Sequence, residues 1–289
     1  MIRFIAAGLF TTIQDLGRFG YRELGVPVSG AMDLQAATNA NLLLGNAPQL
    51  AVLEFTASGP VLEFEEPARI AICGASFVPK LNGLEIAINR PIEIPSGGIL
   101  SFGRPSKGFR AYLAIQDGFI SDKVLGSASF YNGITDRSQF SKGDVIQFNL
   151  NAQSSLPSFS SELDTAMNFE KDVIEVYKGP EFDQLPQEIQ LLLNDGAYTV
   201  APNSSRMAYI LDHSEAISAK EIITAPVQPG TVQLTPSGKL IVLMRDAQTT
   251  GGYARILQLT ESAINFLAQN RAGNSVRFKI IDPLSDTPV

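Results

Sequence analysis

Polar side chains and glycines are concentrated in one stretch near the N-terminus, from residue 11 to residue 45. Gln14, Asp15 and Arg18 stand there among closely spaced glycines, and Arg22 and Glu23 follow. So many glycines in a short run indicate a backbone that bends through conformations which other residues avoid. The stretch therefore predicts a shaped loop that carries a carboxylate, which can accept a proton, and a guanidinium, which can hold an anion.

A helix start follows this loop. After Ser29 and Gly30, apolar residues recur at roughly helical spacing as far as Gly45, and we expect Ser29 or Asp33 to cap the helix. The free N–H groups of a helix start favour negative charge, so residues 28 to 33 could hold a carboxylate or a phosphate. The alternative for Ser29 is that it caps the helix and does nothing more.

A second polar group lies in the C-terminal half. Arg206 follows two serines, and a polar run directly follows the apolar residues LIVLM. A strand that ends in such a run delivers donors and acceptors to one edge of a sheet. The paired glycines 251 and 252 either let a ligand approach the backbone or form a tight turn.

We predict the site where the loop at residues 14 to 18 and the helix start at 29 to 33 face residues 246 to 252. The predicted catalytic residues are Asp15, Arg18 and Asp33, and the predicted substrate-binding residues are Gln14, Ser29, Gly30, Arg206, Asp246, Gln248, Thr249 and Thr250. Arg18 would pair with the carboxylate or phosphate of a small anionic substrate, and Asp15 or Asp33 would accept a proton or orient Arg18. Alternatively, Asp15 and Arg18 form a buried ion pair that holds the loop shut.

Composition excludes several classes of function. The 289 residues carry 22 basic and 29 acidic side chains, a net charge of −7 with no basic run, which argues against a nucleic-acid partner. A single cysteine and a single histidine exclude an internal disulfide and disfavour a metal site. No export signal and no apolar run near the ~20 residues that span a bilayer are evident. We therefore expect a soluble, cytoplasmic protein without a membrane partner.

The remaining chain reads as short apolar runs separated by glycine and proline, a pattern typical of strands and turns. We expect a mainly β fold of mostly antiparallel strands with three short helices, the second at 186 to 193 and the third at 261 to 269, capped by Thr260. The Ser-rich stretch at 152 to 168 reads as a linker between β-modules at 1 to 151 and 169 to 289.

The two halves also resemble each other internally. Three pairs of segments match in the same order: 92 to 102 with 232 to 243, 108 to 115 with 252 to 259, and 142 to 148 with 272 to 278. Chance matches are common in β-rich sequences, but three in one order favour two related β-modules.

Several nucleotide and cofactor motifs are absent from the sequence. It contains no phosphate-binding P-loop, no dinucleotide fingerprint, no nucleophile elbow and no biotin-attachment lysine motif. Instead, a series of motifs extends over nearly the whole chain: TTIQDLGRFGY, GVPVSGAMD, ANLLLGN, LEFTASGP, VLGS, SSRM, GTVQLTPSG and DAQTTGGY. In this order they resemble the carboxyltransferase subdomain A/B family.

That family includes the C subunit of bacterial 5-oxoprolinase, allophanate hydrolase subunit 2, the antagonist of the sporulation-kinase inhibitor, and part of the transferase domain of urea carboxylase. The resemblance implies two related cyclophilin-like β-barrel modules. It also implies ATP-dependent opening of 5-oxoproline to glutamate, together with a kinase-inhibitor-like partner and a lactam-hydrolase subunit. ATP would then be a cofactor of the complex, and the isolated chain would be inactive.

Some positions depart from the family pattern. Ala247 stands where arginine usually precedes Gln-Thr-Thr, and Ala208, Asp117 and Ala272 also differ from the usual residues. If the missing arginine contacts an anionic group, Arg245 or Arg255 must replace it, or this member binds a different ligand.

Two other functions stay open at the level of sequence. One is a component of a biotin-dependent carboxyltransferase that acts on urea or a similar amide, with biotin on a separate carrier. The other is a non-catalytic regulatory protein whose polar loops bind a partner. Genomic neighbours would discriminate among these functions. A neighbouring lactam-hydrolase gene favours the 5-oxoprolinase, and a biotin carboxylase gene with its carrier favours the carboxyltransferase.

Overall fold

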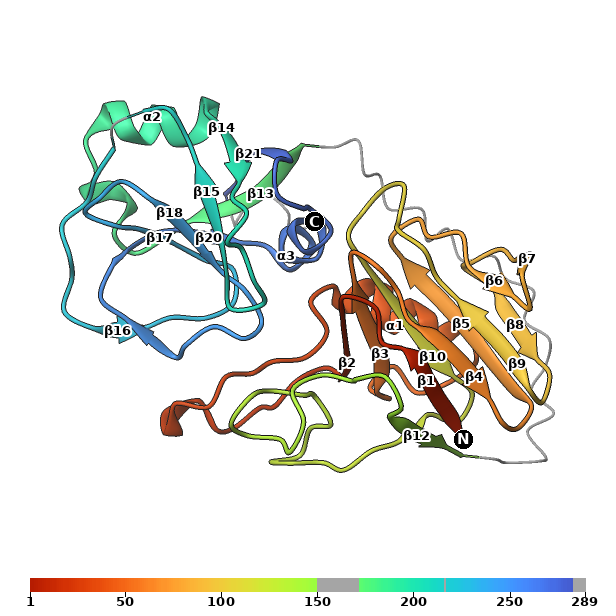
Figure 1. Ribbon diagram of the computed structural model, residues 1–289. Helices are drawn as coiled ribbons and strands as arrows, with labels where there is room; N and C mark the ends of the chain where they lie inside the picture. Colours follow the sequence, from red (N-terminus) through yellow and green to blue (C-terminus); the bar gives the residue numbers. More distant parts are fainter. Residues whose placement is uncertain (150–171, 216, 283–289) are drawn as a thin grey trace, which may run out of the picture. The chain divides into compact units, whose positions relative to one another are not determined.

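The computed structural model describes residues 1 to 149, 172 to 215 and 217 to 282, which form two compact units (Figure 1). The first unit comprises Met1–Arg18 and the described residues from Ser29 to Asn149. The second comprises Phe19–Val28 and the described residues from Asp172 onward. The linker expected at 152 to 168 lies outside the described residues, so the predicted module boundaries stay a prediction.

The expectation of a mainly β fold with a few short helices is confirmed. In the described residues the helices are α1 (Leu34–Leu43), α2 (Gln187–Asp195) and α3 (Glu261–Ala268), with short 3₁₀ turns η1 (Arg22–Leu24) and η2 (Phe182–Gln184). Thr260 caps α3 as expected, because its side chain accepts a hydrogen bond from the Ala263 N–H. None of the described helices combines the length and the apolar character that crossing a bilayer requires.

The first unit contains two antiparallel sheets. One is seven-stranded, in the order β11 (Phe119–Ile120), β12 (Val145–Phe148), β1 (Ile2–Ala6), β4 (Val61–Phe64), β9 (Gly98–Ser101), β6 (Lys80–Leu81) and β7 (Leu84–Glu85). The other is five-stranded, in the order β2 (Phe10–Gln14), β3 (Val52–Thr56), β10 (Arg110–Ile115), β5 (Ala68–Gly74) and β8 (Pro91–Ile94). Side chains from both sheets, among them Phe4, Phe55 and Leu113, form one apolar core.

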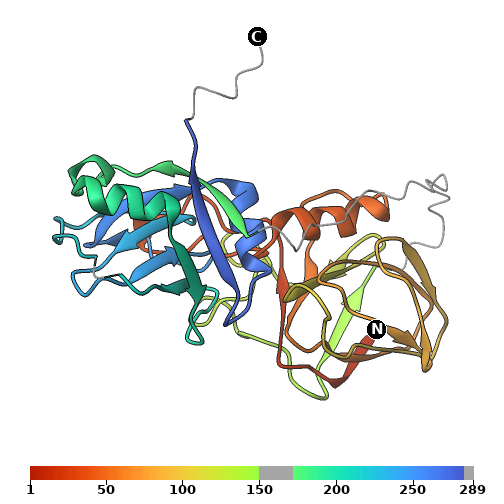
Figure 2. The same cartoon turned by 90° about the horizontal axis from the view of Figure 1, so that it is seen from above.

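The five-stranded sheet is buried on both faces. Helix α1, the orange helix of Figure 2, packs against β10 and β5, and its alanines meet Cys73 and Tyr112 in a second apolar cluster. All six residues of β10 are buried as a result. Polar and apolar side chains on this strand are therefore largely shielded from water.

The second unit contains a closed barrel. Its strands follow the order β13 (Val173–Lys178), β20 (Ala254–Leu259), β17 (Thr231–Leu234), β18 (Leu240–Leu243), β15 (Ala208–Asp212), β14 (Ala197–Val200) and β21 (Ser275–Ile280). A parallel pair, β13 with β21, closes the ring. Beside it, β16 (Ala225–Pro226) and β19 (Thr250–Gly251) form a two-stranded sheet.

The internally matching segments are strands in both units, but they pair differently. Strands β17 and β18 form an antiparallel hairpin in which Val232 lies opposite Val242. The matching β8 and β9 lie in different sheets of the first unit, paired with β5 and with β4 and β6 respectively. The matching strands therefore follow one another in the same order along the sequence of both halves, but they pair with different partners.

Candidate functional site

The carboxylate of Asp15 holds together the loop in which it stands. Its Oδ1 accepts hydrogen bonds from the Gly17 N–H (2.9 Å) and from the hydroxyls of Ser127 (2.6 Å) and Ser129 (2.7 Å), and its Oδ2 accepts one from the Ala128 N–H (2.7 Å). A carboxylate that accepts this many hydrogen bonds from the protein itself stabilises the local structure. Asp15 thus fixes residues 127 to 129 against the start of the glycine-rich loop.

Arg18 holds the same segment from the other side. Its guanidinium is fully buried and donates from Nε to the carbonyl of Val124 (3.0 Å) and from Nη2 to that of Ser129 (2.8 Å). Charged hydrogen bonds to buried carbonyls are among the stronger polar contacts in a protein. This geometry gives Arg18 a structural role, while the catalytic role expected from the sequence stays a prediction.

At the start of α1 the cap is Asp33, whose Oδ1 accepts the Ala36 N–H at 3.0 Å. Ser29 instead adopts a left-handed backbone conformation (φ 57°), and its buried hydroxyl makes no hydrogen bond with the residues that the structure describes. A carboxylate of the chain itself lies at this helix start, because Glu54 Oε2 accepts the Met32 N–H at 2.7 Å. That residues 28 to 33 hold the carboxylate or phosphate of a ligand stays a prediction.

Glu54 belongs to a buried polar cluster that the sequence did not single out. Arg110 Nε lies 4.0 Å from Glu54 Oε1, and the hydroxyl of Tyr112 accepts the Asp33 N–H at 2.8 Å. Burial, followed by the nearby Glu54 carboxylate, raises the pKa of Tyr112 well above its ordinary value. Burial, with the charge of Asp33 second, raises the pKa of the Cys73 thiol to about 12.

The loop and the helix start are brought together within the first unit. The Ala31 N–H donates to the Asp15 carbonyl at 2.9 Å, and a Cβ added at Gly30 would lie 3.0 Å from the backbone of Leu16 and Gly17. Gly30 also has φ +92°, so both its space and its conformation require glycine. The grouping of residues 14 to 18 with 29 to 33 is therefore observed.

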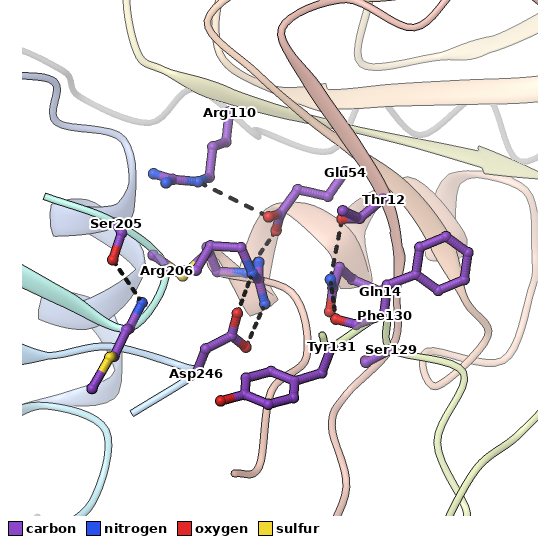
Figure 3. A network of polar contacts seen from close by, with 12 residues as sticks. Thr12, Gln14, Glu54, Arg110, Ser129, Phe130, Tyr131, Ser205, Arg206 and Asp246 are labelled. Carbon is purple, nitrogen blue, oxygen red and sulfur yellow. Dashed lines mark hydrogen bonds and ion pairs between the residues drawn. The ribbon is translucent and has the colours of Figure 1, made fainter. Parts of the chain in front are cut away.

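Gln14, like Ser29, has a buried polar atom that is not hydrogen-bonded within the described residues. Its Nε2 donates to the Thr12 hydroxyl (3.1 Å) and to the Phe130 carbonyl (3.4 Å), as drawn in Figure 3. Its Oε1 is buried without a hydrogen-bond partner among the described residues. An acceptor left in this state is available to a donor from elsewhere.

In the second unit, Arg206 and Asp246 form a bidentate pair. Arg206 donates from Nε to Asp246 Oδ2 (2.8 Å) and from Nη2 to Oδ1 (3.1 Å), with both side chains largely buried (Figure 3). Arg245 is engaged in the same manner, with the carboxylate of Glu261 and with the Asn265 side chain. These two arginines support the strand end on which residues 246 to 252 stand.

Thr249 and Thr250 line a cavity of about 550 Å³ formed entirely by the second unit. The other residues that line it are Arg22, Glu23, Lys178, Gly179, Pro180, Pro226, Val227, Gln228, Thr231, Arg255, Leu257 and Gln258. Arg22 comes from η1, in the segment Phe19–Val28, and Arg255 from the barrel strand β20. This cavity therefore joins the N-terminal loop to the polar run at residues 246 to 252.

Close backbone contacts shape the cavity wall. A Cβ added at Gly179 would lie 2.2 Å from the Arg255 carbonyl oxygen, so the chain can run this close to β20 only with glycine. Arg255 donates from Nε and Nη2 to Glu181 at 3.0 and 2.8 Å. The hydrogen bond from Arg255 lowers the pKa of Glu181, so the pair stays ionised.

The sequence of these two units matches a known protein family. Residues 24 to 280 match the model of the carboxyltransferase domain, subdomain A and B. The chain belongs to this family.

Two curated relatives are similar over nearly their whole length. The C subunit of 5-oxoprolinase from Haemophilus influenzae is 33% identical over 277 residues, 93% of this chain and 88% of that protein. The Escherichia coli protein of the same name is 31% identical over 96% of this chain and 90% of its own length. Among solved structures, the Kluyveromyces lactis urea carboxylase superposes with a TM-score of 0.87 and 28% identity, covering 97% of this chain and 27% of that one.

The departure of this family member at Ala247 has a local explanation. Ala247 is buried in an apolar cluster with Val227 and Leu243, so the position carries no charge toward the cavity. Of the two arginines that could replace the missing arginine, both are paired with a carboxylate, Arg245 with Glu261 and Arg255 with Glu181, but only Arg255 lines the cavity. Arg255 is therefore the replacement that the geometry favours.

The sequence left several cavity residues unassigned. Arg22 lies in the polar stretch, and its position between Gly20 and Gly25, which both adopt left-handed conformations, is the signal that marks it. Lys178, Gln228 and Gln258 are isolated polar residues beside strands, a pattern common to many surface positions. The described residues hold no group of three or more acidic, histidine or cysteine side chains suited to a metal ion.

The predicted site residues thus fall into two groups. Gln14, Ser29, Gly30 and the three predicted catalytic residues belong to the first unit; Arg206 and the residues from Asp246 to Thr250 belong to the second. That these two groups face each other stays a prediction.

Proposed function

We propose that this chain is one component of an ATP-dependent 5-oxoprolinase, which opens 5-oxoproline to glutamate together with a kinase-inhibitor-like partner and a lactam-hydrolase subunit. The observation that supports this most is the extent of similarity. The two relatives named as C subunits of 5-oxoprolinase are matched over 88% and 90% of their length, whereas the solved urea carboxylase is matched over 27% of its chain.

The chemistry of the reaction agrees with a polar, cation-lined site. A lactam carbonyl resists attack by water, and phosphorylation of its oxygen requires cationic and N–H groups around the transferred phosphate. The sequence offers no phosphate-binding motif of its own. In our proposal ATP therefore acts in the assembled complex, and this chain contributes binding and positioning.

The test is reconstitution. The chain is co-expressed with candidate partner proteins, co-purified, and assayed for ATP hydrolysis that depends on 5-oxoproline. We expect turnover from the complex and none from the isolated chain. Robust turnover by the isolated chain would contradict the proposal that it works only in a complex, and a stable complex that ignores 5-oxoproline would contradict the substrate.

A component of a biotin-dependent carboxyltransferase is the second candidate, and the TM-score of 0.87 to urea carboxylase is the observation that favours it. In that function the chain would act on urea or a similar amide, with biotin on a separate carrier protein. Transfer of the carboxyl group from carboxybiotin on an added carrier protein to urea, without any response to 5-oxoproline, distinguishes this candidate. If the complex catalyses neither reaction, the remaining candidate is a regulatory binding protein.

A further inference from the structure

We propose that the cavity of the second unit is a binding site for a small carboxylate ligand of net charge −1, held by Arg22 with Arg255 beside it. The proposal rests on the proposed function only for the identity of its occupants, 5-oxoproline or the glutamate formed from it. None of the comparisons assigns a ligand to these residues. Three features of the cavity support such a ligand: its charged lining, its anchored donors and the unused polar groups of its wall.

The charge of the lining is opposite to that of the chain. The protein carries a net charge of −7, yet the cavity is lined by the cations Arg22, Lys178 and Arg255 and by a single carboxylate, Glu23, which is exposed to solvent. With Glu181 and Asp183, the partners of Arg255 and Lys178, cations and carboxylates balance here, so this part of an acidic surface repels anions less than the rest does.

Only part of this positive charge is already neutralised. Arg255 is paired with Glu181, and Lys178 Nζ lies 3.2 Å from Asp183 Oδ1. Among the described residues, Arg22 has no acidic partner within salt-bridge distance. One uncompensated guanidinium matches a singly charged carboxylate better than a phosphate, which carries about −1.5 to −2 charges near neutral pH.

Both arginines are anchored to adjacent residues of one segment. Arg22 donates from Nη2 to the Val227 carbonyl, and Arg255 donates from Nη1 to the Pro226 carbonyl at 3.1 Å. The Val227 N–H in turn donates to the Thr249 carbonyl at 3.0 Å. The guanidiniums are therefore held before a ligand arrives, which reduces the entropy that binding costs.

The wall also offers neutral groups for the other end of a ligand. The side-chain amide of Gln228 and the hydroxyls of Thr249 and Thr250 make no hydrogen bonds with the described part of the chain. Gln258, by contrast, is fixed by the Thr231 hydroxyl and the Pro229 carbonyl. A volume of about 550 Å³ accommodates a molecule of amino-acid size with accompanying water. These features suit a carboxylate that also carries an amide or amine.

Titration calorimetry of the full chain tests the site, with L-5-oxoproline, L-glutamate and inorganic phosphate as separate probes. Arg22→Ala should weaken carboxylate binding about tenfold or more, the value of one charged hydrogen-bond pair. Arg22→Lys keeps the charge but loses the planar guanidinium, so its affinity for the carboxylate should lie between those of wild type and Arg22→Ala. The matched control is Arg271→Ala, which removes an exposed arginine of the same unit and should leave binding unchanged.

Melting temperatures establish that each variant is folded. If Arg22→Ala detaches residues 19 to 28 from the barrel, Thr250→Val provides a second test. Thr250 is exposed, and loss of its hydroxyl should weaken binding about threefold. Equal affinity of wild type and Arg22→Ala, tighter binding of phosphate than of either carboxylate, or no binding up to about 10 mM would overturn the proposal. Arg22-dependent carboxylate binding by a chain whose complex never hydrolyses 5-oxoproline would overturn the proposed function and leave the site standing.

Discussion

The two units place their polar side chains in opposite situations. In the first unit, Glu54 and Tyr112 lie inside the fold and accept backbone N–H groups at the start of α1, and the buried Arg110 lies beside Glu54. In the second unit, Arg22 and Arg255 line an open cavity and are anchored at one edge of it. The first arrangement organises a backbone, and the second leaves donors available to a ligand. Polar density alone therefore does not identify a binding site; the partners of each polar atom do.

The largest contrast between the two situations concerns access by a reagent. Cys73, the single cysteine, is buried beside Tyr112, and its thiol pKa is raised to about 12, so thiolate is scarce at neutral pH. Labelling by an alkylating reagent should be about 10³-fold or more slower in the native chain than in urea, because it requires opening of the first unit.

The matched variant combines Cys73→Ala with Thr250→Cys, which moves the thiol to the exposed rim of the cavity. This thiol should react at nearly the rate of the unfolded chain. Similar slow labelling of both thiols would contradict the distinction between a closed cluster and an open cavity. Mass spectrometry over time measures both rates.

Breaking the buried cluster should cost stability. Glu54→Ala removes the carboxylate that faces Arg110 and accepts the Met32 N–H, and we expect a loss of about 3–5 kcal/mol in the free energy of unfolding. Denaturant titration measures it. The control is Glu63→Ala, a half-exposed partner of Arg3 on the same unit, which should change stability by less than about 0.5 kcal/mol. A small effect of Glu54→Ala would mean that the cluster does not support the fold.

Arg18→Ala separates the structural role seen here from the catalytic role expected from the sequence. The loss of two hydrogen bonds from a buried guanidinium to Val124 and Ser129 should destabilise the chain by about 3 kcal/mol. Arg104→Ala, at an exposed position of the same unit, should melt as wild type does. In the reconstituted complex, an unchanged melting temperature with lost turnover would instead favour catalysis by Arg18.

The smallest expected effect is on the charge pair at the cavity. Because Arg255 lowers the pKa of Glu181 below its ordinary value of 4.5, the pair stabilises the fold above that pH and loses this contribution as the pH falls through the folded-state pKa. Glu181→Gln should therefore lower stability by about 1 kcal/mol at neutral pH and by much less near about pH 3. The exposed Glu188→Gln on α2 should show no such pH dependence. Denaturation at the two pH values provides the measurement, and an equal loss at both would count against the ionised pair.

Local features could be predicted because they depend on neighbours in the chain. The three helices lie where periodicity, Pro186 and Thr260 indicated them, since caps and fixed φ angles act within one turn. The strands were found for the same reason, as apolar alternation between glycine and proline. Thr249 and Thr250 were also named from their position at a strand end, and both line the cavity.

Contacts between distant segments decided the rest. The sequence of β3 and β10 reads as apolar strand with occasional charge, and only their pairing places Glu54 opposite Tyr112, beneath α1. Likewise, β8 and β9 resemble β17 and β18 in sequence but pair with other strands, because register and sheet membership depend on the whole set of neighbours.

The cavity shows most directly which features the sequence determines and which the tertiary structure decides. The sequence by itself determined that Arg22 stands in a glycine-punctuated loop and that Arg255 follows a polar strand end. Tertiary structure decided that residues 19 to 28 belong with the barrel and that both guanidiniums are anchored on Pro226 and Val227. The physical reason is that a hydrogen bond between residues 205 positions apart leaves no pattern in a single chain, since its partner is a backbone carbonyl that every residue carries.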